Sequence, residues 1–268
     1  MSLQLDHIVI AVFNLETAIA DYTAAGFTVE PGGEHPGRST HNALVVFDDG
    51  SYFELIAWKA PAPQERWWQL LQRHGEGIVD FALLPGSTAE VVAGAARRGL
   101  DLDGPLDGGR LRPDGERLLW QTARPRSADL PFLCGDITPR ALRVPEGDVR
   151  VHANGATGVA SLTVAVQDID ITLARYRNLL SDDETRRPTV SRPVALPGGG
   201  LRLAFAELGT STLVLASPRD PVLGPSSPLA QRLAIRGEGP YAIVLRIRAG
   251  AAPDVSSLTH GASIEFDT

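Results

Sequence analysis

The fold is indicated by a stretch that the chain repeats: Leu5-Asp6-His7-Ile8-Val9-Ile10-Ala11-Val12 at 5–12, and Val-Ala-Ser-Leu-Thr-Val-Ala-Val at 159–166. Each copy is a short apolar run typical of a buried strand, and each precedes an amphipathic helical pattern. The first helical pattern covers 15–25, and Gly26 supplies its stop. The alanines at 11 and 165 and the tyrosines at 22 and 176 are separated by the same 154 positions. An internal repeat of this kind predicts a fold assembled from similar units.

Two weaker copies complete the series. One has a strand-like run at 77–84 and a helical pattern at 88–98 that ends at Gly99, 73 positions after Gly26. The other begins at 241–245 and stops after 264–266. We therefore expect the last copy to lack its final two strands.

The unit is β-α-β-β-β, because three strand-like runs follow the first helix, at 27–29, 41–47 and 52–58. A doubly wound α/β sheet would need a helix after nearly every strand, and here three strands follow each helix. We predict an α+β fold of about 3.5 paired βαβββ modules that form two cups. The predicted domains are 1–145, the candidate active cup, and 155–268, a degenerate second half.

Composition narrows the classes of function. The chain has 268 residues, a formal net charge of −7 and one cysteine. The absence of a basic stripe argues against a nucleic-acid partner, and one cysteine allows no internal disulfide. No apolar run is long enough to span a bilayer, and the first residues do not resemble a signal peptide. We expect a cytoplasmic monomer or homodimer, without a membrane partner, that binds a small molecule.

Four stretches carry a resemblance to a known family. They are 5–12 with its histidine, Pro31-Gly32-Gly33-Glu34-His35-Pro36-Gly37, Thr40-His41-Asn42-Ala43-Leu44 and Tyr52-Phe53-Glu54-Leu55-Ile56-Ala57. Together they resemble the glyoxalase-like domain of the vicinal oxygen chelate superfamily. The match covers about residues 4–140, and the second half shares only the fold pattern. The superfamily includes lyases, isomerases, ring-cleaving dioxygenases, antibiotic-modifying enzymes and pure binding proteins, so the resemblance implies a fold more firmly than a reaction.

The resemblance also implies a divalent metal, such as Zn, Ni, Mn or Fe, held by residues on strands one and four of each module. These positions fall on His7 and Glu54, and the offset of 73 adds Asp80. Imidazole and carboxylate groups suit such ions, and a buried carboxylate needs a partner. The fourth position falls on Gly135, which has no ligand atom. A structural histidine–carboxylate pair therefore remains an open interpretation.

In the second half the corresponding positions carry no metal ligands. By alignment of the copies, His7 corresponds to Ser161, Glu54 to Leu213 and Asp80 to Ala242. We therefore expect no metal in the second cup. Selective loss of these groups favours a functional role for the first set, because a purely structural pair would be equally useful in both halves.

Other residues are candidates for the substrate. One of His41 and Asn42 should face the cup, since neighbours on a strand alternate. Glu54 and His41 are the candidate catalytic residues. Candidate substrate contacts are Asn42, Trp58, Trp120 and Arg112, although core packing for the tryptophans and a solvated turn for Arg112 remain open. For His35, in a Gly/Pro-rich loop, we favour a solvated side chain over one at the cup mouth.

Two functions follow from these residues. The first is a metal-dependent lyase, isomerase or epimerase that acts on a small carbonyl or vicinal-oxygen substrate, with Glu54 or His41 moving a proton. The alternative is a binding protein that holds a small molecule in the same cup without changing it. No phosphate-binding glycine loop, nucleophile elbow or HExxH pattern is present, and Cys134 lies in an apolar run where we expect an inert thiol.

Overall fold

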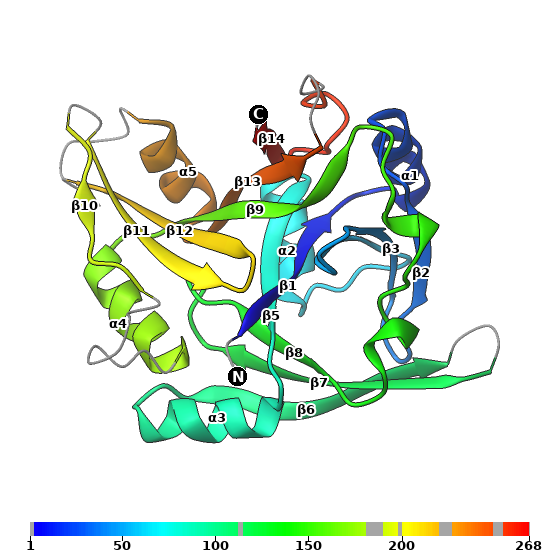
Figure 1. The fold of residues 1–268 in the computed structure, drawn as a ribbon, viewed down its shortest axis with the longest axis horizontal. Helices are drawn as coiled ribbons and strands as arrows, with labels where there is room; N and C mark the ends of the chain where they lie inside the picture. Colours follow the sequence, from blue (N-terminus) through cyan, green and yellow to red (C-terminus); the bar gives the residue numbers. More distant parts are fainter. Residues whose placement is uncertain are drawn as a thin grey trace.

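The computed structural model describes residues 3–111, 115–180, 190–197, 200–219, 227–248 and 254–267, which form two curled sheets with helices around them (Figure 1). The eight-stranded sheet has the order β2-β3-β4-β1-β5-β8-β7-β6. Its strands are β1 (Gln4–Ala11), β2 (Glu30–Glu34), β3 (Thr40–Val46), β4 (Tyr52–Trp58), β5 (Gly77–Leu84), β6 (Leu102–Leu111), β7 (Arg117–Pro125) and β8 (Phe132–Asp136).

The six-stranded sheet has the order β10-β11-β12-β9-β13-β14. Its strands are β9 (Ala156–Ala165), β10 (Val194–Ala195), β11 (Leu201–Leu208), β12 (Ser211–Pro218), β13 (Gly239–Ile247) and β14 (Ser263–Asp267). The helices are α1 (Leu15–Ala24), α2 (Arg66–His74), α3 (Thr88–Arg97), α4 (Ile169–Leu180) and α5 (Pro228–Arg236). Two short 3-10 turns, Arg140–Leu142 and Asp148–Arg150, precede β9.

The strand pairing confirms the repeated module. In each complete module the first strand pairs in parallel with the last, as β1 with β4, β5 with β8 and β9 with β12. The modules then join through antiparallel first strands, β1 with β5 and β9 with β13. This arrangement is the paired βαβββ fold that the sequence predicts.

Two strand predictions were wrong in detail. The second strand of the first module is Glu30–Glu34 rather than 27–29, and Phe27 instead packs in the core. Pro31 is tolerated in this strand because β2 lies at the edge of its sheet, where a missing N–H donor leaves no neighbour unpaired.

The last module also differs from the expectation. Its final strand β14 runs parallel to β13 and pairs Ala242 with Ser263, so β14 takes the place of strand four. The described part of this module therefore contains strands one and four and lacks the helix and the two strands between them. Sequence order alone had suggested that the missing strands were the last two.

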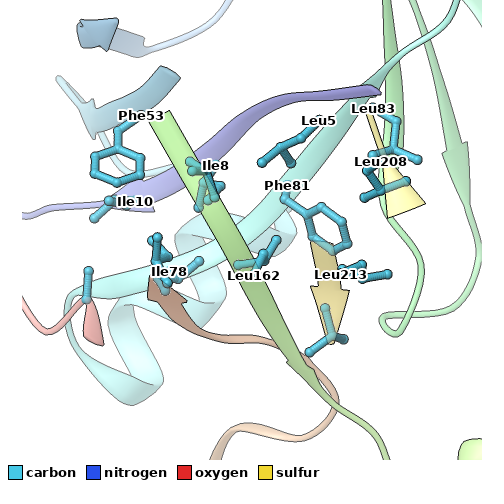
Figure 2. Packing of buried hydrophobic residues seen from close by; sticks show 14 of the residues in the cluster. Leu5, Ile8, Ile10, Phe53, Ile78, Phe81, Leu83, Leu162, Leu208 and Leu213 are labelled. Atoms are coloured by element: carbon cyan, nitrogen blue, oxygen red, sulfur yellow. The ribbon is translucent and has the colours of Figure 1, made fainter. Parts of the chain in front are cut away.

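The hydrophobic core is shared between the two sheets. Leu162 of β9 lies among Ile8 of β1 and Phe81 and Ile78 of β5, and Leu213 lies beside Phe81 (Figure 2). All five side chains are at most 5 % exposed. The division into domains at 145–155 remains a prediction, since one continuous cluster of buried side chains crosses it.

The helices cover opposite faces of the first sheet. Helix α1 and helix α3 place Tyr22 and Ala95 in the shared core. Helix α2 instead places Leu71 and Trp67 against the concave face, beside Val9 and Phe132. The cup is thus partly covered by the segment that joins its two modules. None of the described helices is long and apolar enough to cross a bilayer.

Candidate functional site

A β-bulge at the start of β1 brings two neighbouring residues together. Leu5 pairs with Leu83 and His7 with Ala82, so Asp6 has no partner in the ladder. Regular alternation would separate Asp6 from His7, whereas the bulge re-aims one side chain. The Nδ1 atom of His7 lies 2.7 Å from Oδ2 of Asp6. An ionised Asp6 can only accept, so Nδ1 of His7 donates this hydrogen bond. Nε2 of His7 then remains available on the cup side.

Asp6 is held by a buried network of charges. Its side chain is fully buried, and Nη1 of Arg143 and Nη1 of Arg140 donate to it at 2.9 and 2.6 Å. Burial alone would raise the pKa of Asp6, but Arg143, His7 and Arg140 outweigh burial and hold it well below the ordinary value. Arg143 also donates to the hydroxyl of Tyr52 at 2.6 Å. Tyr52 stacks on the imidazole of His7 with centroids 4.7 Å apart, so the network fixes the ring from two sides.

Glu54 is the centre of the polar cluster. It lies in an apolar strand and is 8 % exposed. Nδ2 of Asn42 donates to Oε1 of Glu54 at 2.6 Å, and Nε2 of His35 lies 3.6 Å from the same oxygen. Nε2 of His7 lies 3.5 Å from Oε2. The structure therefore brings together His7, Glu54 and Asn42 and adds His35, which we expected in solvent.

His41 does not join this cluster. It shares the face of β3 that carries Ala43 and Val45, both of which belong to the core on the convex side of the sheet. Burial and the nearby Lys59 lower its pKa from the ordinary histidine value. The alternation of β3 places Asn42 rather than His41 beside Glu54, and a catalytic role for His41 stays a prediction.

Asp80 is engaged by groups other than His7 and Glu54. Arg66 Nη1 and Trp67 Nε1 donate to Oδ2 at 3.0 and 2.8 Å, and the backbone N–H of Phe81 donates to Oδ1. Arg124 Nη1 lies 3.6 Å from Oδ2. Asp80 therefore serves as the anchor of an arginine and tryptophan cluster contributed mainly by α2.

The strand register also changes which residue occupies the fourth ligand position that the family resemblance implies. Val9 pairs with Glu54 in the first module, and the residue 73 positions after Val9, Ala82, pairs with Phe132. Phe132, rather than Gly135, thus corresponds to Glu54, and its ring meets His7 edge-on at 5.3 Å. A phenyl ring offers no ligand atom to a metal ion.

The donor set does not fit a metal held by the protein alone. Of the four positions, only His7 and Glu54 offer ligand atoms that are not already bound to cations. Among the described residues, no three His, Cys, Asp or Glu side chains are arranged to hold an ion.

The second sheet carries none of these groups. Its register pairs Thr163 with Val214, so Val214, rather than Leu213, corresponds to Glu54. Ser161 and Ala242 take the places of His7 and Asp80. Leu213 points instead into the shared core.

The remaining candidates lie near the cup or outside the description. Trp58 and Trp120 pack against the concave cluster around Val9 and Phe132, and Trp58 Nε1 donates to Glu65 at 2.9 Å. Contact of either ring with a ligand stays a prediction. Arg112 lies outside the described residues.

Comparison with known proteins agrees with this architecture. A hypothetical protein from Staphylococcus aureus superposes with a TM-score of 0.71 at 14% identity, covering 100% of this chain and 99% of that one. A triple mutant of 4-hydroxymandelate synthase from Streptomyces coelicolor superposes with a TM-score of 0.66 at 13% identity, covering 93% and 72%. A fusion protein of a xylose isomerase-like TIM barrel and 4-hydroxyphenylpyruvate dioxygenase gives a TM-score of 0.56 at 15% identity, covering 93% of this chain and 37% of that one.

These identities establish a shared fold and nothing finer. No curated protein sequence matches the chain. The sequence model of the glyoxalase-like domain matches residues 5–180, more than half of the 268 residues. The match and the paired βαβββ sheets agree, and the chain belongs to the glyoxalase-like domain family of the vicinal oxygen chelate superfamily.

Proposed function

We propose that the first cup binds a small molecule at Glu54 and His7. The observation that carries this proposal is the nearly buried carboxylate of Glu54, whose polar contacts among the described residues are with Asn42, His35 and His7. Burying a carboxylate is costly unless it is paired and hydrogen-bonded. The second sheet adopts the same strand arrangement with Val214 at this position, so folding does not require the carboxylate. Retention of Glu54 at the concave surface therefore supports a role in binding.

A metal-dependent lyase, isomerase or epimerase is the second candidate. One observation favours it: the hydrogen bond that Nδ1 of His7 donates to Asp6 leaves Nε2 directed at Glu54. Metal-binding histidines commonly have such a carboxylate behind them. With two protein ligands only, solvent or substrate would have to complete the coordination of the ion.

Thermal shift measurements test the binding proposal. The panel consists of small carboxylic acids, ketones and phenols, screened against wild type, Glu54→Gln and Glu265→Gln. Glu265 is the matched control, since it is an exposed glutamate on the second sheet. A ligand at 100 times its Kd stabilises the folded state by about 2.7 kcal/mol. We expect at least one compound to stabilise wild type and Glu265→Gln but not Glu54→Gln.

Two outcomes would count against the proposal. Stabilisation that is equal in Glu54→Gln would place the ligand elsewhere, and a panel that stabilises no form would leave the cup without a demonstrated ligand. Metal content separates the two candidates. After chelation and re-addition of zinc, nickel, manganese or iron, stoichiometric metal that is lost in Glu54→Gln would favour the enzyme over simple binding.

A further inference from the structure

A hollow lies beside Phe132, whose ring also meets His7 of the Glu54 cluster edge-on. Its volume is about 230 Å³, and its lining includes Arg38, Arg66, Trp67 and Arg124. Drug-sized ligands usually occupy roughly 300–1,000 Å³. The hollow therefore suits a smaller molecule, about the size of a single ring with one substituent.

Arg124 is the unusual group in this hollow. Its guanidinium carbon lies 4.7 Å from the ring centre of Trp67 and 4.4 Å from that of Phe132. Within the part of the chain that the structure describes, its side chain donates no hydrogen bond, and its nearest carboxylate, on Asp80, is 3.6 Å away. A guanidinium has five N–H donors, so most of the donors of Arg124 have no acceptor among the described residues.

Burial disfavours the charge on Arg124. Loss of solvation lowers its pKa, and Asp80 only partly opposes this effect. The side chain is 37 % exposed, so the N–H groups remain open to an incoming molecule. An anion placed against them would replace the missing solvation.

The charges around the hollow favour an anion. Three guanidinium groups face two carboxylates, Asp80 and Glu65. Asp80 already accepts hydrogen bonds from Arg66, Trp67 and the backbone, and Glu65 accepts from Trp58. Arg38 is exposed and pairs with no carboxylate among the described residues. The hollow thus has unpaired positive charge beside apolar walls.

We propose that this hollow binds the anionic group of a small aromatic acid, with Arg124 and Arg38 as its donors. The planar part of the ligand lies against Trp67, Leu130 and Phe132, which line the same hollow. This inference rests on the proposed function, because Phe132 joins the hollow to His7 and so makes the two regions parts of one binding site. Arginine suits carboxylate and phosphate groups alike, since its planar donors match both.

Isothermal titration with three probes tests the inference. Benzoate and phenyl phosphate carry the anion, and benzyl alcohol is a neutral molecule of similar shape. We expect millimolar binding of at least one anion, weaker binding at high salt, and binding of benzyl alcohol that is at least about tenfold weaker. The anion that binds more tightly assigns the natural group as carboxylate or phosphate.

Arginine variants locate the binding. Arg124→Gln should raise the Kd of the anion by about tenfold or more, as expected for loss of a charge-assisted hydrogen bond. Arg126→Gln is the matched control, because Arg126 lies two residues away, is 77 % exposed and pairs with Asp103. Arg38→Gln provides a second test that does not disturb the aromatic packing, and circular dichroism verifies folding of each variant.

The outcomes distinguish this inference from the proposed function. Equal binding of benzyl alcohol, or an unchanged Kd in folded Arg124→Gln and Arg38→Gln, would overturn the anion site while leaving a binding cup. Failure of both anions to bind wild type would also overturn it. Anion binding that depends on Arg124 but is unchanged in Glu54→Gln would support the hollow and contradict the role of Glu54.

Discussion

Replacing Asp6 with asparagine removes the charge that holds two arginines beneath the cup. Asp6 is fully buried and contacts Arg143 at 2.9 Å and Arg140 at 2.6 Å. Breaking a buried ion pair from one side costs about 3–5 kcal/mol. We expect the lower end of this range, since Asp136 remains paired with both arginines. A loss of about 3 kcal/mol corresponds to a Tm lower by about 6–12 °C for a chain of this size.

Urea denaturation at pH 7, followed by circular dichroism, measures this effect. Asp103→Asn is the control, because Asp103 forms an exposed pair with Arg126 that we expect to contribute less than about 1 kcal/mol. The double variant Asp6→Asn, Arg143→Met should be less destabilised than the sum of the single variants. A loss below about 1 kcal/mol in Asp6→Asn would refute the reasoning.

Acid provides an independent check on the same group. The pKa of Asp6 is lower in the folded protein than in the unfolded chain, where it is about 3.9. Its contribution to stability is therefore fully present above that unfolded value and is lost as the pH falls through the lowered folded value. The stability difference between wild type and Asp6→Asn should shrink at acidic pH, and a difference that grows there would contradict the assignment.

Three further predictions concern the shared core, the cysteine and the contact between the halves. Leu162→Ala should cost about 2–5 kcal/mol, and this loss should appear in tryptophan fluorescence, because all four tryptophans lie in the first half while Leu162 lies in the second. A fluorescence transition that stays at the wild-type position would show that the halves unfold separately. Burial raises the pKa of Cys134 to about 12, so labelling by a thiol reagent at pH 8 should require unfolding, and rapid labelling of the folded protein would contradict its burial. His260 lies 2.8 Å from Glu76 and 3.0 Å from Asp21, and His260→Ala should lower the free energy of unfolding by about 1–3 kcal/mol in urea titrations, whereas an unchanged midpoint would show that this contact contributes nothing.

The module could be predicted from sequence because first strands and helices keep similar lengths between copies, 8 to 10 residues for β1, β5 and β9 and 10 to 12 residues for α1, α3 and α4. Both the 73-residue and the 154-residue offsets correspond to equivalent strand positions in the two sheets. The same offset could not locate β8. The two strands between α3 and β8, which are β6 and β7, differ in length from β2 and β3, their counterparts in the first module. Register then places Phe132, three residues before Gly135, opposite Ala82.

The candidate site was predictable where it lies on first and fourth strands, and less so elsewhere. His7 and Glu54 follow from strand positions that the family shares. Whether His41 or Asn42 faces the cup depends on which alternate residues of β3 point to the concave side. A single sequence does not decide this. His35 reaches Glu54 from a loop. Asp6 contacts Nδ1 of His7 because of a β-bulge, and no pattern in the sequence predicted that bulge.

The position of β14 affects how the molecule meets other copies of itself. As the last strand of the six-stranded sheet, β14 presents one row of backbone donors and acceptors that pairs with no other strand in the described part of the chain. Such edges invite intermolecular sheet growth and aggregation. The strand is only five residues long, and Glu265 and Asp267 alternate along its exposed face. Antiparallel docking of two copies would bring these carboxylates close together, so their repulsion protects the edge from self-association.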